Sequence, residues 1–555
     1  MTTAAAWLML ALSSAPADGD GDGDETVRML VFLAERRPIF LRLRITTGGH
    51  PLEAAWLDAV RSVHAGLDRN HDGKLSNQEL DEKAFAAIVR LATGAPKSPT
   101  ASPLDADKDG SITVDELAEA LKPALGPFRL ISRRRRTAGR TDALFEQLDR
   151  DKDEALTRPE LSAIAGSLRP LDLDDDEMIA ATEIEAPGAS AASELMAQVG
   201  GRRSREAALP PAIELTPGES SLRLARTLIR RYDRAPDGRP IRLDDRLSPE
   251  EFSIGPGAFE KADTNRDGDL DARELRTYLA KAPIDLSLDV DIAPDAAGRS
   301  TIQVAGGGKL AEGARVRQLA DGDIELAVGP IRLDIRIEPP SAGVDEVRRV
   351  LTNRFKAADV NKNGVLEGKE PDTLDAARSP LAGLRSVLDR DGDGKVTLPE
   401  LLDLGDRQTG AARRRLQATV DDEARAIFGI LDTDRDRRLS AREVMRTVDR
   451  ALTWDADSDG RVTPDEIPYH FLVTIARGGL PGLTGVNANV NAPAISTSEA
   501  HSSAPDWFRK MDTNQDGDIS RREFLGPRDA FERLDRDKDG LIDADEARAA
   551  VPGKE

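Results

Sequence analysis

The sequence contains no cysteine, and aromatic residues make up only 4% of it. Disulfide bonds, which hold many small secreted domains together, are therefore excluded as a source of stability. The five histidines, His50, His64, His71, His470 and His501, are scattered along the chain and show no zinc-binding spacing. A glycine-rich phosphate loop and a nucleophile elbow are also missing. We therefore expect that the protein is not an enzyme.

Long apolar segments and broad positive charge are scarce as well. The apolar run at residues 7–12 is far too short to cross a bilayer about 30 Å thick, and no other segment approaches that length. The formal net charge is −22, whereas nucleic-acid binding requires clustered positive charge. The basic run Arg133–Arg136 is interpreted as a solvated linker. We expect no membrane span and no nucleic-acid partner.

The short apolar run near the start nevertheless has a second interpretation. It is followed by Ala15-Pro-Ala17 and then by the acidic segment 18–22. This order predicts a signal peptide at residues 1–17 and a secreted or periplasmic protein, although no Lys or Arg precedes the apolar run. The alternative is a disordered N-terminus on a cytosolic protein.

What the sequence has in abundance is acidic residues in a recurring twelve-residue pattern. The first copy, residues 68–79, reads Asp-Arg-Asn-His-Asp-Gly-Lys-Leu-Ser-Asn-Gln-Glu. Eight copies keep Asp or Asn at positions 1, 3 and 5, Gly at 6, an aliphatic residue at 8 and Glu at 12; they begin at Asp68, Asp105, Asp263, Asp359, Asp389, Asp455, Asp512 and Asp535. Three more, from Asp149, Asp172 and Asp432, have Glu154, Glu177 and Arg437 in place of the glycine.

This spacing suits Ca²⁺, which takes six to eight oxygens at roughly 2.3–2.6 Å. A twelve-residue loop can aim oxygens at one ion from positions 1, 3, 5, 7, 9 and 12. Position 6 turns sharply, which glycine does without steric penalty. The glutamate at position 12 can supply two oxygens and so favours Ca²⁺ over Mg²⁺. The pattern resembles the EF-hand family, and the resemblance covers most of the chain.

The resemblance implies the following calcium ligands, where the residue at position 7 offers its backbone carbonyl. In the eight full loops they are Asp68, Asn70, Asp72, Lys74 and Glu79; Asp105, Asp107, Asp109, Ser111 and Glu116; Asp263, Asn265, Asp267, Asp269 and Glu274; Asp359, Asn361, Asn363, Val365 and Glu370; Asp389, Asp391, Asp393, Lys395 and Glu400; Asp455, Asp457, Asp459, Arg461 and Glu466; Asp512, Asn514, Asp516, Asp518 and Glu523; Asp535, Asp537, Asp539, Leu541 and Glu546. In two of the loops without glycine they are Asp149, Asp151, Asp153 and Glu160, and Asp432, Asp434, Asp436 and Glu443.

Position 8 gives an independent check, because its side chain is not a ligand. In the family it packs against the partner loop, and here it is Leu, Ile or Val in all eleven loops, which a merely acidic, solvated stretch would not require. The loops without glycine should bind more weakly, because a residue other than glycine in left-handed backbone costs about 1–2 kcal/mol. The loop at Asp172 also has Ala180 at position 9, and we expect it to fold without binding metal.

EF-hands normally fold in pairs that bury their apolar faces together. Loop starts 23 residues apart favour pairing Asp149 with Asp172, Asp432 with Asp455, and Asp512 with Asp535. Longer spacings favour Asp68 with Asp105 and Asp359 with Asp389. Asp263 is expected to pair with a stretched, degenerate hand that starts at Asp233 and has no conventional metal site. The predicted pairs are residues 51–132, 137–187, 220–282, 341–408, 409–475 and 505–555.

Strands are expected in two places. Residues 38–46 alternate apolar and polar, which predicts one strand in the N-terminal segment 18–50. The stretches 284–292, 324–328 and 331–337 alternate in the same way, which predicts a small β module at 283–340. Segments 188–219 and 476–504 are rich in Ala, Gly, Pro, Ser or Asn and are interpreted as linkers. The expected fold is mainly α, a tandem array of about six EF-hand pairs with an antiparallel β module between the third and fourth.

The leading functional hypothesis is multi-site Ca²⁺ binding that orders and stiffens the pairs for a structural or interaction role. The alternative is a calcium-dependent sensor that exposes hydrophobic grooves to partner proteins. Such grooves are rich in methionine, and this chain has only 7, which disfavours the alternative. The sequence indicates calcium ions as partners and does not identify a protein partner.

Overall fold

The computed structural model describes most of the chain outside the N-terminus and the longest connections. The described residues are 27–34, 37–76, 79–80, 82–93, 104–134, 143–184, 210–215, 222–233, 245–254, 256–281, 284–293, 299–305, 314–318, 322–338, 344–368, 370, 385–389, 391–433, 438–478 and 504–550. The predicted signal peptide and nearly all of both predicted linkers lie outside these ranges.

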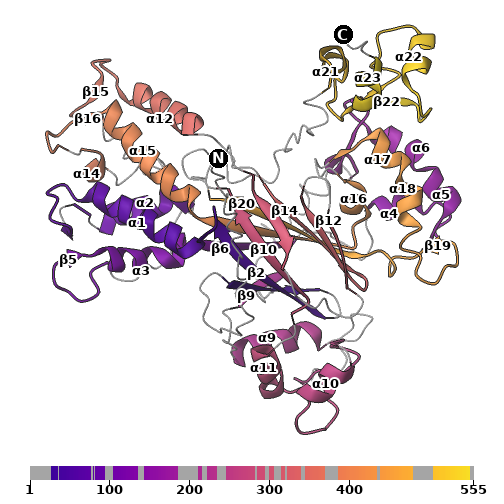
Figure 1. The fold of residues 1–555 in the computed structure, drawn as a ribbon, viewed down its shortest axis with the longest axis horizontal. Coiled ribbons are helices and arrows are strands. Elements are labelled where there is room, and N and C mark those ends of the chain that lie inside the picture. The colour runs from indigo at the N-terminus through magenta and orange to yellow at the C-terminus, as the bar shows by residue number, and fades with distance from the viewer. Residues whose placement is uncertain are drawn as a thin grey trace, which may run out of the picture.

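Within the described ranges, two six-stranded sheets form the centre of the molecule (Figure 1). The first has the order β11-β10-β2-β1-β9, with β3 beside β2; its strands are β1 (Val27–Leu33), β2 (Pro38–Thr47), β3 (His50–Pro51), β9 (Ala212–Leu215), β10 (Leu286–Ile292) and β11 (Thr301–Val304). The second has the order β12-β13-β14-β20-β17-β6; its strands are β6 (Phe128–Arg134), β12 (Ala314–Gln318), β13 (Ile324–Val328), β14 (Ile331–Ile337), β17 (Leu416–Ala424) and β20 (Tyr469–Arg477). Both sheets are mixed, because β10 runs parallel to β2, and β14 and β6 run parallel to β20 and β17.

The two sheets pack face to face as a β-sandwich. Alternation along the strands explains this, since every second residue of β10 is buried. Inward-facing side chains of both sheets, such as Leu41 and Leu333, belong to one apolar core. The rings of Phe32 and Phe471 join the sheets edge to face, with their centroids 5.5 Å apart. The sandwich thus assembles strands from across the whole chain.

Helical lobes surround this sandwich (Figure 1). Lobe A contains α1 (Leu52–Leu67), α2 (Glu82–Thr93), α3 (Val114–Leu125), α12 (Val344–Ala358), α14 (Arg385–Leu388) and α15 (Leu398–Arg413), which share one apolar core. Lobe B contains α4 (Ala143–Leu148), α5 (Arg158–Ser162), α6 (Ile164–Leu168), the 3₁₀ turn η1 (Arg169–Leu171), α7 (Ala181–Ile184), α16 (Ile427–Leu431), α17 (Ala441–Met445) and α18 (Thr447–Ala451). Each of these two lobes therefore joins segments from the first and second halves of the chain.

Two further groups of helices come from single segments. Lobe C contains α9 (Leu222–Tyr232), α10 (Pro256–Ala262) and α11 (Ala272–Ala280), and it packs on the outer face of the first sheet against Val31, Leu33 and Phe40. The C-terminal pair contains α21 (Asp506–Met511), α22 (Arg528–Leu534) and α23 (Ala544–Ala550), and it has a small apolar core of its own. In Figure 1 this pair lies beside lobe B, next to α17.

The expected mainly α tandem array is wrong. The structure is 39% helix and 26% strand, so neither class dominates. β17 and most of β20 lie inside the segment 409–475 that was assigned to one helical pair, and β6 overlaps the end of the segment 51–132 that was assigned to another. The strands of the supposed β module at 283–340 go to both large sheets, where β10 and β14 have parallel partners from elsewhere. Alternation revealed these strands, but it does not identify the strand that each one pairs with.

No helix among the described residues has the length and apolarity needed to span a membrane.

Candidate metal centres

The acidic loops are closed by hydrogen bonds between their own carboxylates and backbone. In the first loop the amide of Gly73 donates to Oδ2 of Asp68 at 2.8 Å. The amide at position 6 makes the same bond in the other described loops, for example from Gly460 to Asp455 at 2.9 Å. For most loops the preceding helix ends just before position 1, as α1 ends at Leu67 with Asp68 as its C-cap. One oxygen of the first aspartate thus fixes the turn. The other oxygen accepts only a longer bond from the amide of Asp72, at 3.3 Å, and keeps a lone pair for a ligand.

The glutamate at position 12 folds back over its loop. In the first loop Oε1 of Glu79 accepts from the amide of Arg69 at 2.9 Å, and Oε2 accepts from the amide of Ser76 at 2.8 Å. These bonds help lower the pKa of Glu79 although burial opposes the charged form. The same glutamate caps the following helix: Thr113 and Glu116 form a capping box at the start of α3. The sequence therefore places this carboxylate at the mouth of the loop by helix capping.

The carboxylates at positions 1, 3 and 12 converge within single loops. In the loops from Asp105, Asp149, Asp172, Asp389 and Asp455 these three residues each offer an oxygen, and the three oxygens lie within 4.8 Å of one another. Oδ1 of Asp263, Asp389 and Asp535 is buried and has no hydrogen-bond donor among the described residues. A buried carboxylate oxygen without a donor costs free energy unless a cation meets it. The donor set of oxygens alone is the one that Ca²⁺ prefers.

Two of the three loops without glycine keep the same backbone path. Glu154 and Glu177 adopt φ of 64° and 66°, close to the left-handed values of the loop glycines. Their amides donate to Oδ2 of Asp149 and Asp172, both at 3.1 Å. Arg437, Asp434 and Asp436 lie outside the described residues. The loop from Asp172, expected to be empty, brings Asp172, Asp174 and Glu183 together as the full loops do.

Pairs of loops are joined by two-stranded ladders at position 8. Four joints match the expected partners: β4 (Leu75–Ser76) with β5 (Ser111–Ile112), β15 (Val365–Leu366) with β16 (Val396–Thr397), β21 (Asp518–Ser520) with β22 (Leu541–Asp543), and the bridge from Leu247 to Leu270. In lobe B the expected partners are wrong. There β7 (Leu156–Thr157) pairs with β19 (Arg461–Val462), and β8 (Ile179–Ala180) pairs with β18 (Arg438–Leu439). The loop at Asp149 thus joins the loop at Asp455, and Asp172 joins Asp432.

The stretched hand of lobe C closes as an EF-hand does at both ends. The amide of Asp245 donates to Oδ2 of Asp233 at 3.2 Å, in the manner of the position-6 amide. Oε2 of Glu251 accepts from the amide of Ser248 at 2.9 Å, in the manner of positions 9 and 12. Residues 234–244 between them lie outside the described ranges.

Sequence reasoning missed a set of cations that cross between paired loops. The residue at position 7 of one loop reaches the acid at position 5 of its partner: Lys74 to Asp109 at 3.4 Å, Arg438 to Asp176 at 3.4 Å, Arg461 to Asp153 at 2.8 Å, and Arg246 to Asp267. Lys395 reaches Glu367 at position 9 of its partner at 3.3 Å. The recurrence of Lys or Arg at position 7 was the sequence signal, because only the carbonyl of that residue is a predicted ligand.

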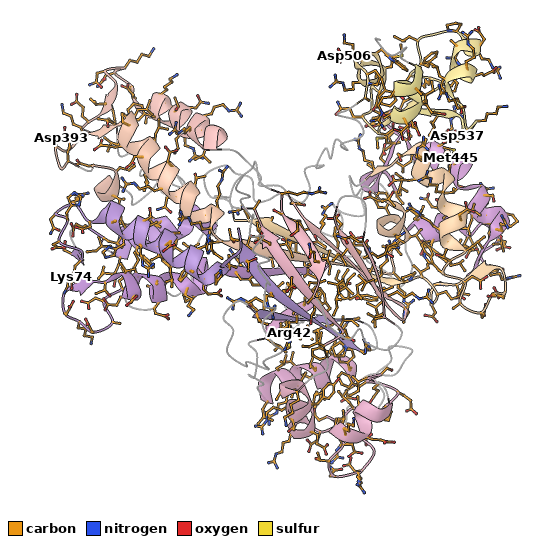
Figure 2. The ribbon with its side chains drawn as sticks, viewed as in Figure 1. Arg42, Lys74, Asp393, Met445, Asp506 and Asp537 are labelled. Carbon is orange, nitrogen blue, oxygen red and sulfur yellow. The ribbon has the colours of Figure 1, made fainter. Side chains whose placement is uncertain are left out.

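The C-terminal pair differs in its electrostatics. Burial raises the pKa of Asp516, at position 5 of its loop, to about 8, and neighbouring carboxylates add to the rise. Burial also raises the pKa of Asp518 above its ordinary value, although Arg442 opposes this rise. These carboxylates are more enclosed than those of the exposed loops in lobe A, such as Asp393 at the tip shown in Figure 2.

A family model described as EF hand matches the chain at residues 104–122, 257–280, 386–404, 506–525 and 528–549. These segments include the loops from Asp105, Asp263, Asp389, Asp512 and Asp535, and together with the loop geometry they make the chain a multi-EF-hand protein of the EF-hand superfamily. EF-hands imply calcium binding. No curated protein and no solved structure matches the chain.

Proposed function

We propose that the protein binds Ca²⁺ at its EF-hand loops in a secreted or periplasmic setting. Bound metal would order and stiffen the lobes around the sandwich, for a structural or interaction role. The observation that best supports this role is that lobes A and B each join hands from distant segments into one apolar core. Metal at those loops therefore acts on contacts between the two halves of the chain. The protein is proposed to have no enzymatic activity.

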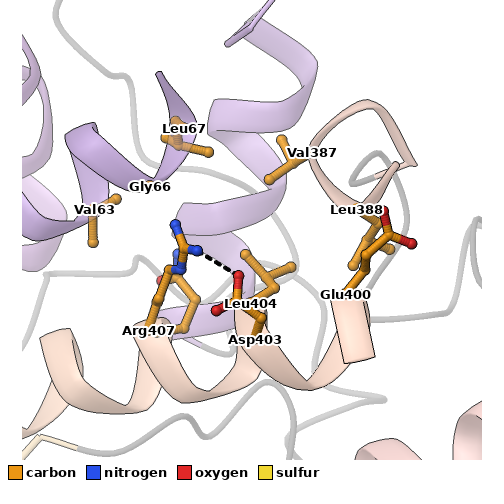
Figure 3. Close-up of a pocket in the computed structure, with 10 residues that line it drawn as sticks. Val63, Gly66, Leu67, Val387, Leu388, Glu400, Asp403, Leu404 and Arg407 are labelled. Atoms are coloured by element: carbon orange, nitrogen blue, oxygen red, sulfur yellow. Dashed lines mark hydrogen bonds and ion pairs between the residues drawn. The ribbon is translucent and has the colours of Figure 1, made fainter. Parts of the chain in front are cut away.

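The same packing argues against the sensor alternative. A sensor opens an apolar groove between paired hands when it is loaded. In lobe A that surface is already covered, because Val63 and Leu67 of α1 face Leu404 of α15 across the cleft drawn in Figure 3. Arg407, on the same face of α15, is held by Asp403 at 2.5 Å. Opening this lobe would expose a core shared by two distant pairs.

Bound calcium would also neutralise much of the net negative charge of the chain. Each ion adds two positive charges, so eight ions would change the formal charge from −22 to −6. Without metal the clustered carboxylates repel one another and disfavour the compact state. Metal that binds only the folded state stabilises it by mass action. Calcium would thus serve the purpose that disulfides serve in other secreted domains.

Calorimetric titration with Ca²⁺ and Mg²⁺ tests the proposal. We expect at least eight Ca²⁺ sites at millimolar metal, together with a gain in helical circular dichroism and no uptake of a hydrophobic dye. Far fewer sites would contradict the assignment of the loops, and strong dye uptake on loading would favour the sensor. The location has its own test: N-terminal sequencing of the protein recovered from the periplasm or the medium should begin at Asp18.

A further inference from the structure

The C-terminal pair meets lobe B through polar groups. Its apolar core contains only residues from 504–547, and none of the apolar cores of the described residues includes side chains of both units. Arg522 donates to Oδ1 of Asp175 at 2.7 Å, and the side-chain amide nitrogen Nδ2 of Asn514 donates to the backbone carbonyl of Asp176 at 3.1 Å. Contacts of this kind are weakened by competing charge, whereas an apolar interface is not.

Arg442 makes the strongest of these contacts. It lies at the start of α17 in lobe B, and its side chain is 21% exposed. Its Nε and Nη2 donate to the two carboxylate oxygens of Asp518 at 2.6 and 2.8 Å, and its Nη1 donates to Oδ2 of Asp539 at 3.0 Å. A bidentate guanidinium–carboxylate pair is the geometry in which such contacts are strongest.

Arg442 takes the place of a cation that the C-terminal pair itself lacks at position 7. Every other pair has a Lys or Arg at position 7 that reaches an acid of its partner loop, as Lys74 does with Asp109. In the C-terminal pair the residues at position 7 are Asp518 and Leu541, so neither loop supplies that cation. Arg442 brings a positive charge to the same place, beside Asp539 at position 5, from the neighbouring lobe.

We propose that Arg442 fastens the C-terminal pair to lobe B while the loops of that pair are free of calcium, and that Ca²⁺ binding by the pair releases it. This inference rests on the proposed calcium binding. Asp539 is a predicted ligand of the loop from Asp535, so Ca²⁺ and Arg442 draw on the same carboxylate charge. An ion in that loop lowers the attraction for the guanidinium and weakens a contact that has no apolar core to sustain it.

Thermodynamic linkage makes the effect reciprocal. If Ca²⁺ weakens docking, then docking weakens Ca²⁺ binding by the same factor. Arg442→Gln should therefore do two things at once: it should release the pair without calcium, and it should raise the calcium affinity of the pair. Couplings of this kind are typically about five- to 150-fold, and we expect about tenfold here.

The test uses the full chain, in which the absence of cysteine allows clean labelling. Ser162→Cys in lobe B and Ala549→Cys in the C-terminal pair are both exposed positions for a fluorescent donor and acceptor. We expect energy transfer to be high in chelator and to fall when Ca²⁺ is added. With Arg442→Gln it should be low in chelator already. Asp518→Asn removes the bidentate acceptor from the other side and should give the same result if Arg442→Gln disturbs lobe B.

The matched control is Arg533→Gln, because Arg533 is 75% exposed and its one ion pair among the described residues is with Asp529 of its own helix, at 3.7 Å. It should leave both energy transfer and calcium affinity unchanged. Filling of the C-terminal loops is measured as the calorimetric heat lost in a Glu523→Gln/Glu546→Gln variant. If these loops fill but energy transfer stays constant or rises, the inference fails and the calcium function stands. If no calcium heat is observed in any loop, the proposed function itself fails.

Discussion

Glu154 is held in a backbone conformation that its side chain disfavours. Its φ of 64° lies in the left-handed region, where a residue other than glycine costs about 1–2 kcal/mol. The loop nevertheless keeps its turn, because the amide of Glu154 donates to Asp149 at 3.1 Å and Glu160 closes the far end through Thr157 at 2.9 Å. The strain is therefore compensated by the carboxylates and by pairing with the loop from Asp455.

The first prediction follows from this strain. Glu154→Gly should raise the calcium affinity of the loop from Asp149 by about tenfold, since strain of about 1–2 kcal/mol is removed, and this gain outweighs the screened attraction that one exposed negative side chain exerts on the ion. Calorimetry on the full chain measures it. The reverse change, Gly73→Glu in the first loop, should weaken that site by a similar factor. Equal affinities before and after both changes would contradict the argument.

His470 is a buried charge on the opposite face of β20 from the sandwich core. Its Nε2 lies 2.9 Å from Oδ2 of Asp334, and its Nδ1 lies 3.3 Å from Oε2 of Glu423. Burial disfavours the charged imidazolium, but the two carboxylates outweigh burial and raise the pKa of His470 to about 9. Arg332, 3.4 Å from the other oxygen of Asp334, adds a second positive charge to the cluster.

The second prediction concerns pH. The folded pKa of about 9 exceeds the ordinary value of 6.5, so the stabilisation is complete below pH 6.5 and is lost as the pH rises through 9. His470→Gln should lower the free energy of unfolding by about 3 kcal/mol at pH 6, because two enclosed carboxylates lose their counter-charge. Chemical denaturation at pH 6 and 9.5 measures the free energy of unfolding of the wild type and of the variant. A gap between wild type and variant that does not shrink at pH 9.5 would contradict the assigned charge.

At the scale of elements, local pattern identifies the hands but not all of their partners. The aliphatic residue at position 8 does lie in a two-stranded ladder, as Leu75 and Ile112 show. In lobe B, however, Leu156 and Ile179 belong to loops with the short spacing of a pair, and each is joined to a loop from the other half of the chain. Every position-8 residue is aliphatic, so any loop is chemically able to pair with any other. Tertiary contacts across the sandwich decide between them.

The third prediction tests the crossed pairing with engineered cysteines. Ala180 lies directly opposite Arg438 in the antiparallel ladder. Directly opposite residues have Cβ atoms about 4.5–5.5 Å apart, which a disulfide can span with small adjustment. Ala180→Cys with Arg438→Cys should therefore form a disulfide under mild oxidation, and no native cysteine competes.

The control shares one of the two cysteines. If the loops from Asp149 and Asp172 paired with each other, Ala180 would face Ala155, so Ala180→Cys with Ala155→Cys should stay reduced under the same conditions. Peptide mapping by mass spectrometry identifies the bridge. Efficient closure of the control pair, with an open Ala180–Arg438 pair, would restore the pairing that the sequence favoured.

At the scale of the molecule, the chain contains a long internal repeat. Each repeat consists of a strand, two hands, a second strand and two more hands. In the first repeat the strands are β2 and β6, and in the second they are β14 and β17. Corresponding loops begin at Asp68 and Asp359, and at Asp149 and Asp432. Lobes A and B each combine the corresponding hands of the two repeats. Because the motif of the single hand recurs many times, the longer repeat of two strands and four hands is difficult to recognise in the sequence.

The repeat also explains why the sandwich was missed. Strands such as β6 and β17 pair with each other in parallel register, Leu416 with Phe128, although nearly 300 residues of chain separate them. A strand of seven to nine residues between two hands looks like a linker until its partner is known. Sequence reasoning could therefore place the loops and several strands, whereas the central architecture depends on pairings between the two repeats that no local pattern encodes.

This architecture leads to the last prediction, on how calcium and stability are coupled. Lobes A and B are inserted between sandwich strands and join the two repeats, so metal that orders them should also stabilise the sandwich. One site at calcium a hundredfold above its dissociation constant adds about 2.7 kcal/mol. We expect chelator to lower the melting temperature of the sandwich and these lobes together, in one calorimetric transition, while the C-terminal pair, with its separate core, melts in another. Magnesium at the same concentration should raise the melting temperature less than calcium does, because the smaller, octahedral Mg²⁺ does not favour two oxygens from one glutamate. A melting temperature of the sandwich that does not change with calcium would contradict this prediction. It would mean that the stability of the sandwich strands does not depend on the order of the lobes inserted between them.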